Sequence, residues 1–143
     1  VLHWVQAVEG RLPEPTAPVL SGDALYLDSC RLGRGLGVYD APRRLLAALL
    51  GGQVREAIMH REEGGCCGAE AGYAALDHSG PGRVAQDAVA DAPDLPVVIA
   101  DPTCAAHLAP HTGRRVYPLA RLLARALVAR APHPEKHLEE PVP

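Results

Sequence analysis

Continuous apolar runs alternate along the chain with segments whose apolar residues repeat every third or fourth position. The first pattern predicts strands that are buried on both faces, and the second predicts amphipathic helices. The predicted strands are residues 24–27, 53–59, 97–100 and 116–117. The predicted helices are residues 2–8, residues 42–50, a segment that begins near Pro81 and stops at Pro93, a segment that begins at Pro102, and residues 119–127. This alternation indicates an α/β domain with a mainly parallel sheet flanked by helices.

Glycine, proline and capping residues set the boundaries of these elements. Residues 11–22 are rich in proline and are expected to form an extended linker after the first helix. Asp40 is expected to cap the next helix, which has Pro42 in its first turn, and Gly51 and Gly52 are expected to end it. We expect three parts in the chain: a helix and linker over residues 1–22, the α/β domain over residues 23–131, and a flexible tail over residues 132–143.

Composition narrows the classes of protein to which the chain can belong. Its 143 residues are enough for a single domain core. A net charge of -3 and only 3% aromatic residues argue against nucleic acid as a partner, because there is neither a basic field nor a set of stacking rings. The longest apolar runs, such as residues 45–50, are far shorter than the ~20 residues of a membrane-spanning helix. With no secretion signal before the globular part, we expect a soluble, cytoplasmic protein without a membrane span of its own.

The four cysteines, Cys30, Cys66, Cys67 and Cys104, are the residues with the clearest chemistry. Cys66 and Cys67 are adjacent, so their α-carbons are about 3.8 Å apart, closer than an unstrained disulfide normally needs. Thiols of this kind in a reducing compartment hold a metal or take part in redox chemistry. The alternative is that all four are small buried apolar side chains, but an adjacent pair among glycines favours ligation.

The cysteines also follow the ends of three successive predicted strands. Cys30 follows the first strand, Cys66 and Cys67 follow the second, and Cys104 follows the third. Binding sites of parallel sheets form beyond the carboxyl ends of the strands. All four thiols are therefore expected to converge at one edge of the sheet.

A Cys-Cys-Gly triplet with one further cysteine on each side is a specific pattern. The segments that carry it are Asp28-Ser29-Cys30, Gly33, Gly37, Ala41-Pro42-Arg43, Cys66-Cys67-Gly68 and Asp101-Pro102-Thr103-Cys104. Together they resemble the cysteine-rich CCG domain over roughly residues 23–128. That family includes the B subunit of heterodisulfide reductase and the iron–sulfur subunits of glycolate oxidase and of bacterial lactate utilisation.

The resemblance implies a metal centre. The family pattern has five cysteines per repeat; Cys30, Cys66, Cys67 and Cys104 match four of them, and Asp101 stands in the place of the fifth. A four-thiolate set suits a [4Fe–4S] cluster or a zinc ion. Two adjacent thiolates reach two irons of a cluster more easily than they reach one tetrahedral zinc, which favours the cluster.

The resemblance also implies a function. It indicates an iron–sulfur electron-transfer domain of a heterodisulfide reductase-like or glycolate/lactate oxidase-like oxidoreductase, acting with flavin or iron–sulfur partner subunits. Family members carry two repeats, and residues 1–5 resemble the segment that closes a repeat, as residues 116–123 do here. We therefore expect a C-terminal repeat that partners a preceding CCG repeat. The alternative is a non-catalytic domain in which zinc or free thiols serve folding and assembly.

Three other residues are candidate ligands. Asp101 could offer a carboxylate oxygen, but it is also well placed to cap the helix that begins at Pro102, and this role is favoured. His107 shares a helical face with Cys104, and His60 precedes the cysteine pair. A histidine in either position is more often a surface or packing residue than a ligand.

Overall fold

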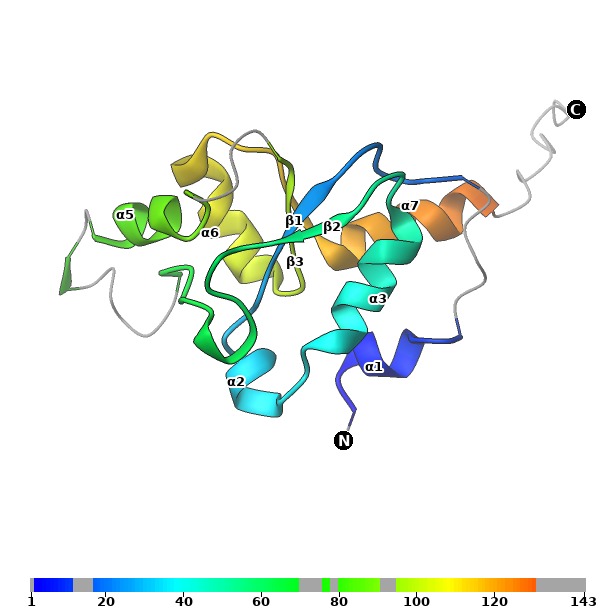
Figure 1. The fold of residues 1–143 in the computed structure, drawn as a ribbon, viewed down its shortest axis with the longest axis horizontal. Coiled ribbons are helices and arrows are strands. Elements are labelled where there is room, and N and C mark those ends of the chain that lie inside the picture. Colours follow the sequence, from blue (N-terminus) through cyan, green and yellow to red (C-terminus); the bar gives the residue numbers. More distant parts are fainter. Residues whose placement is uncertain (1, 12–16, 70–75, 78–79, 91–94, 131–143) are drawn as a thin grey trace, which may run out of the picture.

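In the computed structural model, the described part of the chain forms an all-parallel, four-stranded sheet with the strand order β2-β1-β3-β4 (Figure 1). The structure describes residues 2–11, 17–69, 76–77, 80–90 and 95–130. The strands are β1 (Ala24–Leu27), β2 (Val54–Glu56), β3 (Val97–Ile99) and β4 (Val116–Pro118). The α/β architecture predicted from the alternating pattern is therefore confirmed.

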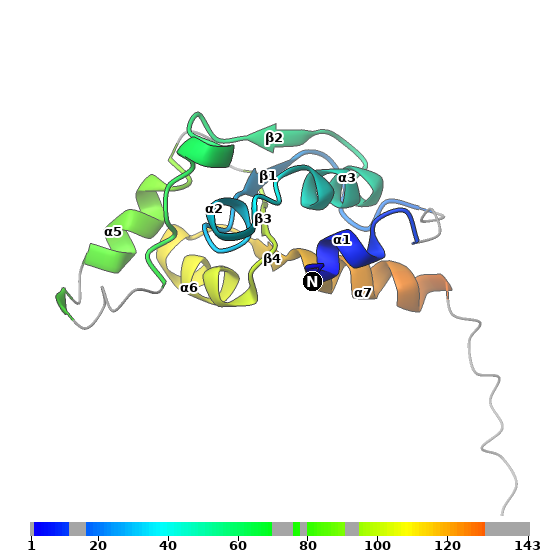
Figure 2. The ribbon, with the colours of Figure 1, turned by 90° about the horizontal axis from the view of Figure 1, so that it is seen from below.

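Helices cover both faces of this sheet. The helices are α1 (Trp4–Val8), α2 (Gly33–Leu36), α3 (Asp40–Leu49), the short 3-10 helix η1 (Arg61–Glu63), α5 (Gly80–Asp87), α6 (Pro102–Thr112) and α7 (Leu119–Arg130). Figure 2 shows α1, α3 and α7 on one side of the sheet and α5 and α6 on the other. None of the helices among the described residues is long and apolar enough to cross a bilayer.

The central strand β1 is buried on both faces, as its unbroken apolar sequence predicts. Successive side chains of a strand point to opposite faces. Ala24 and Tyr26 therefore join the core beneath α1, α3 and α7, whereas Leu25 and Leu27 join the core beneath α5 and α6. The two cores share this strand, so the loop that follows β1 is anchored from both sides.

Several observed boundaries differ from the expected ones by a few residues, and two of these differences have a clear physical cause. The strand predicted at residues 53–59 is limited to Val54–Glu56, because β2 is an edge strand whose one partner in the sheet is β1. The prediction that Asp40 is an N-cap is wrong. The helix begins at Asp40 itself after Tyr39, and the Asp40 carboxylate accepts a hydrogen bond from the Arg61 guanidinium at 2.6 Å. The Asp40 side-chain oxygen that would accept a hydrogen bond from a helix N–H in a cap is instead bonded to Arg61, which is distant in the sequence.

Some predictions fall outside the described residues. They concern the tail at residues 132–143, the first residue of the chain, and part of the proline-rich linker at residues 12–16. The three-part division of the chain accordingly stays a prediction. The helix expected to stop at Pro93 ends earlier, because α5 spans Gly80–Asp87 and residues 88–90 form a turn.

Candidate metal centre

The four cysteines lie beyond the carboxyl ends of three neighbouring strands. Cys30 is in the loop between β1 and α2, Cys66 and Cys67 follow η1, and Cys104 is in the first turn of α6. All four are free thiols. Cys67 and Cys104 are 8% and 4% exposed, whereas Cys30 and Cys66 are only partly buried. The topology thus brings together the residues that the sequence places up to 74 positions apart, as expected for the edge of a parallel sheet.

The thiols are arranged as two pairs. Burial raises the pKa of Cys30, and the charge and hydrogen bonding of Cys66 raise it further. In the second pair, a hydrogen bond with the Cys104 thiol lowers the pKa of Cys67 to about 6, while the same contact and burial raise the pKa of Cys104. The Cys67 and Cys104 thiols therefore share a hydrogen bond, as the Cys30 and Cys66 thiols do.

The two pairs are close enough to act on each other. The charge of Cys67 contributes to the raised pKa of Cys30, after burial and Cys66, and the charge of Cys30 acts on Cys104. Among the described residues, no group of three or more histidine, cysteine, aspartate or glutamate side chains surrounds a single ion position. The donor set is four soft sulfurs in two neighbouring pairs, which fits ligation of iron or zinc by thiolates.

The backbone at the Cys-Cys-Gly triplet requires its glycine. Gly68 has a φ of +86°, a conformation that residues with a side chain rarely adopt. A Cβ at this position would lie 3.0 Å from the Pro81 carbonyl oxygen and 3.3 Å from the Cβ of Val84 in α5. The Gly68 N–H lies 3.4 Å from the Cys66 sulfur, to which it donates a hydrogen bond. Glycine therefore lets the triplet turn sharply while its backbone packs directly on α5.

Asp101 adopts the predicted role of a helix cap. Its side-chain Oδ1 accepts a hydrogen bond from the Thr103 N–H at 2.8 Å, and Pro102 occupies the first turn of α6. Its other oxygen lies 3.9 Å from the Arg31 guanidinium. Asp101 is close enough to Cys104 for its charge to act on that thiol. The cap orients the first turn of α6, which carries Cys104.

The two candidate histidines each have a ring nitrogen next to a backbone carbonyl. His60 Nδ1 lies 3.0 Å from the Ala57 oxygen, and His107 Nε2 lies 3.2 Å from the Pro81 oxygen. The His107 ring also packs on His111 with centroids 4.7 Å apart. His107 is close enough for its charge to act on Cys67. Ligation by His60, His107 or Asp101 stays a prediction.

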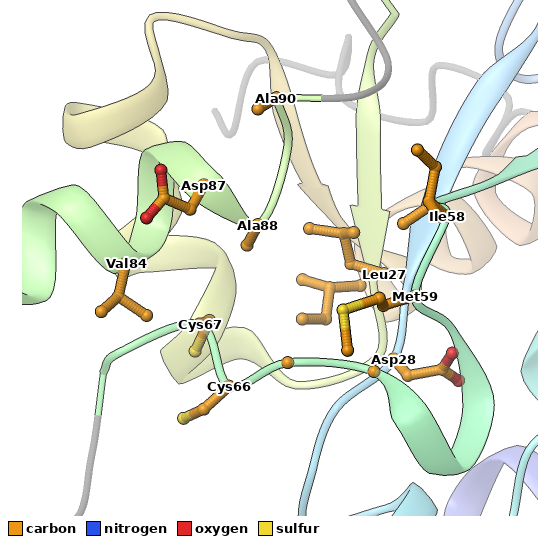
Figure 3. A pocket seen from close by; sticks show the side chains of 14 residues that line it. Leu27, Asp28, Ile58, Met59, Cys66, Cys67, Val84, Asp87, Ala88 and Ala90 are labelled. Atoms are coloured by element: carbon orange, nitrogen blue, oxygen red, sulfur yellow. The ribbon is translucent and has the colours of Figure 1, made fainter.

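A cavity of about 500 Å³ lies beside the Cys66-Cys67 segment. Figure 3 shows the two cysteines at its edge near Val84, with Leu27 and Met59 across from them. Its lining is largely aliphatic. The cavity gives this side of the cysteine segment an apolar environment.

The structure adds three charged residues to which the sequence pattern assigned no role at the site. Arg43 in α3 is buried and bonds both Asp28, at the end of β1, and Glu56 in β2. Asp28 lies two positions before Cys30, so the group is next to the candidate centre. A signal was available in the sequence, because Arg43 interrupts the otherwise buried, apolar side of its helix.

Comparisons with known proteins identify a family model and curated relatives that match parts of the chain. The family model of a cysteine-rich domain, CCG, matches residues 24–109. Over 77 residues, 50% of the chain, the sequence is 52% identical to the EtfAB:quinone oxidoreductase of Syntrophomonas wolfei subsp. wolfei, of which the match covers 10%. Over 59 residues, 41% of the chain, it is 42% identical to the "Probable iron-sulfur-binding oxidoreductase FadF" of Bacillus subtilis (strain 168), of which the match covers 8%. No solved structure matches the chain.

The curated relatives match the chain over a short region, and the family model matches it over a longer one. The chain spans a tenth or less of the length of these two curated relatives, so they are similar to it over one region only. The family model, by contrast, covers more than half of the chain and includes all four cysteines. The chain therefore belongs to the family of cysteine-rich CCG domains.

Proposed function

We propose that this chain is an iron–sulfur domain that transfers electrons within an oxidoreductase, with a [4Fe–4S] cluster held by Cys30, Cys66, Cys67 and Cys104. The observation that carries the proposal is the convergence of four thiols from three strand ends. One relative is named as iron–sulfur-binding, and both are named as oxidoreductases. A bound cluster supplies a centre that accepts and releases single electrons.

The pairing of the thiols supports a cluster over a single zinc ion. A zinc ion sits about 2.3 Å from each of its sulfur ligands, so four sulfurs must surround one point. In a cubane cluster each thiolate binds a different iron, which suits thiols that approach as two separate pairs. The adjacent Cys66 and Cys67 lie in different pairs, as two ligands of different irons would.

The protein around the thiols supports electron transfer at an exposed edge. Cys67 and Cys104 are buried in the core beneath α5 and α6, which excludes water from one side of the site. Cys30 and Cys66 are partly exposed, which leaves the other side open to a partner. We propose flavin or iron–sulfur subunits as that partner, and a preceding CCG repeat beside this one. The oxidoreductase is of the heterodisulfide reductase or glycolate/lactate oxidase type and works in the cytoplasm, where thiols stay reduced.

The test is metal analysis of the 143-residue chain purified and reconstituted without oxygen. We expect iron and sulfide in equal amounts, about four of each per chain, and a paramagnetic signal after reduction by one electron. Cys67→Ser should lose iron while circular dichroism retains the α/β signal. Met59→Leu is the matched control, because it removes an exposed sulfur near the site that is not a proposed ligand. A colourless protein with about one zinc per chain would show instead that the centre serves folding and assembly.

A further inference from the structure

The Arg43 guanidinium is buried with every one of its donors in use. Arg43 is 8% exposed. Its Nη1 and Nη2 donate to the two oxygens of Asp28 at 2.8 and 2.7 Å, and its Nε and Nη2 donate to the two oxygens of Glu56 at 2.7 and 2.8 Å. Nη1 also donates to the Tyr39 carbonyl oxygen at 2.7 Å. These contacts use all five N–H groups of the side chain.

The environment of Arg43 keeps it charged and immobile. Its guanidinium stacks over the Tyr26 ring, 4.8 Å from the centroid. Burial alone would lower the pKa of Arg43, but the hydrogen bonds with Asp28 and Glu56 outweigh it and raise the pKa. A bidentate pair on each side leaves the side chain a single orientation. The end of β1, the start of α3 and the edge strand β2 are therefore tied to one point.

Asp28 extends this connection to the second cysteine loop. The Oδ2 atom of Asp28 accepts a hydrogen bond from the Arg61 backbone N–H at 2.7 Å. Arg61 begins η1, which leads into Cys66, while Asp28 itself lies two residues before Cys30. A second bond joins the same loops, because the Arg34 guanidinium donates to the Gly64 carbonyl oxygen. The two members of the Cys30–Cys66 pair are thus carried by loops that share a carboxylate.

The backbone at Arg61 shows that this connection constrains the loop. Arg61 has a φ of +57°, and among the described residues it is the one non-glycine residue with a positive φ. Such a conformation persists where the surroundings hold it in place. Here Asp28 holds the Arg61 N–H and Asp40 holds its guanidinium at 2.6 Å. The path of the chain toward Cys66 therefore depends on contacts made by the Cys30 side of the site.

We propose that Asp28 and Arg43 are positioning residues, which set the Cys30 loop and the Cys66 loop in the relative arrangement that metal binding requires. This inference rests on the proposed function, because the relative placement of the two loops matters for metal binding by their cysteines. A role in stability alone does not account for the network, since a buried ion pair is often no more stabilising than apolar residues of the same size. The network lies at the base of the loops that carry Cys30 and Cys66, and the need to place these two loops explains why it is there.

The experiment measures the geometry of the loops without any metal. In a chain carrying Cys67→Ala and Cys104→Ala, Cys30 and Cys66 are oxidised to a disulfide while glutathione disulfide is reduced to two glutathione molecules. The equilibrium constant reports how well the loops present the two thiols to each other. We expect Asp28→Asn to lower this constant on the order of tenfold, because the effective concentration of one thiol beside the other falls.

Glu56→Gln separates positioning from stability. Glu56 bonds Arg43 as Asp28 does, yet no described contact links it to the Arg61 backbone. Its substitution should weaken the fold, measured by urea unfolding, while the disulfide constant stays within about twofold. An unchanged constant in Asp28→Asn, or parallel decreases in both variants, would overturn the proposal. If Asp28→Asn does not fold, the disulfide constant of Arg43→Lys tests the proposal instead. A lysine keeps the positive charge but cannot supply the bidentate bonds.

Iron uptake in the four-cysteine chain provides the second measurement. Asp28→Asn and Arg43→Lys should lower the affinity for iron by about tenfold or more, as loss of a residue that orients ligands commonly does. Arg44→Lys is the matched control, since the neighbouring Arg44 is exposed and contacts Glu9 away from the cysteines. A wild-type chain that takes up no iron would reject the cluster, whereas the disulfide constant would still decide the positioning role.

Discussion

The two cysteine pairs are held in place by different physical means. Cys30 and Cys66 lie on partly exposed loops that charged hydrogen bonds connect through Asp28. Cys67 and Cys104 are buried among aliphatic side chains of the core beneath α5 and α6. Hydrogen bonds to charged groups are directional, whereas apolar packing is not. The first pair therefore depends on a few specific contacts, and the second depends on the integrity of the whole core.

The largest expected effect comes from removing core volume on the side of the buried pair. Leu108 in α6 is 0% exposed and belongs to the same core cluster as Cys67 and Cys104. Leu108→Ala should lower the free energy of unfolding by about 2–5 kcal/mol, because it leaves a cavity. Urea unfolding measures this loss. Leu127→Ala on α7, where the side chain is partly exposed, is the control and should cost far less; equal losses would contradict the comparison.

The next effect tests the turn that connects the two pairs. Gly68→Ala should lower the free energy of unfolding by about 1–3 kcal/mol, because a side chain is strained at that φ and would meet the Pro81 carbonyl. Thermal unfolding of the metal-free chain provides the measurement. Gly65→Ala is the matched control, since a Cβ there has no atom within 4 Å. A Gly68→Ala chain as stable as Gly65→Ala would show that the triplet is not constrained by α5.

A smaller effect is expected on the side of the exposed pair. Arg61→Gly and Arg61→Ala both remove the ion pair with Asp40, but only glycine relieves the left-handed backbone. The glycine variant should therefore be the more stable of the two by about 1 kcal/mol. Chemical denaturation of both variants side by side measures the difference. If alanine were equally tolerated, the loop before Cys66 would not be held in a strained conformation.

An effect of similar size concerns the helix cap next to the buried pair. Asp101→Ala should lower the free energy of unfolding by about 1 kcal/mol, and Asp101→Asn should change it little, because asparagine also accepts the hydrogen bond from Thr103. Iron content should be the same in both variants as in the wild type. An Asp101→Asn chain that lost iron at an unchanged melting temperature would identify Asp101 as a ligand.

Local sequence patterns predicted the structure correctly where interactions between nearby residues determine it. The strand at residues 24–27 was predicted with its observed limits, because an unbroken apolar run fits a position with helices on both faces. The cap at Asp101 was also predicted, since it needs only a carboxylate two residues before a free N–H. The same reasoning failed at Asp40, where the carboxylate had a distant alternative partner in Arg61.

The sequence by itself determined the α/β class, the central strand, and the edge of the sheet at which the thiols gather. These follow from periodicity and from the rule that parallel strands present their carboxyl ends together. The tertiary structure alone decided which thiols pair, and that Arg43 would bond carboxylates 15 and 13 residues away. Such contacts have no periodicity in the sequence. They depend on the path of the loops, which is set only when the helices pack on both faces of the sheet.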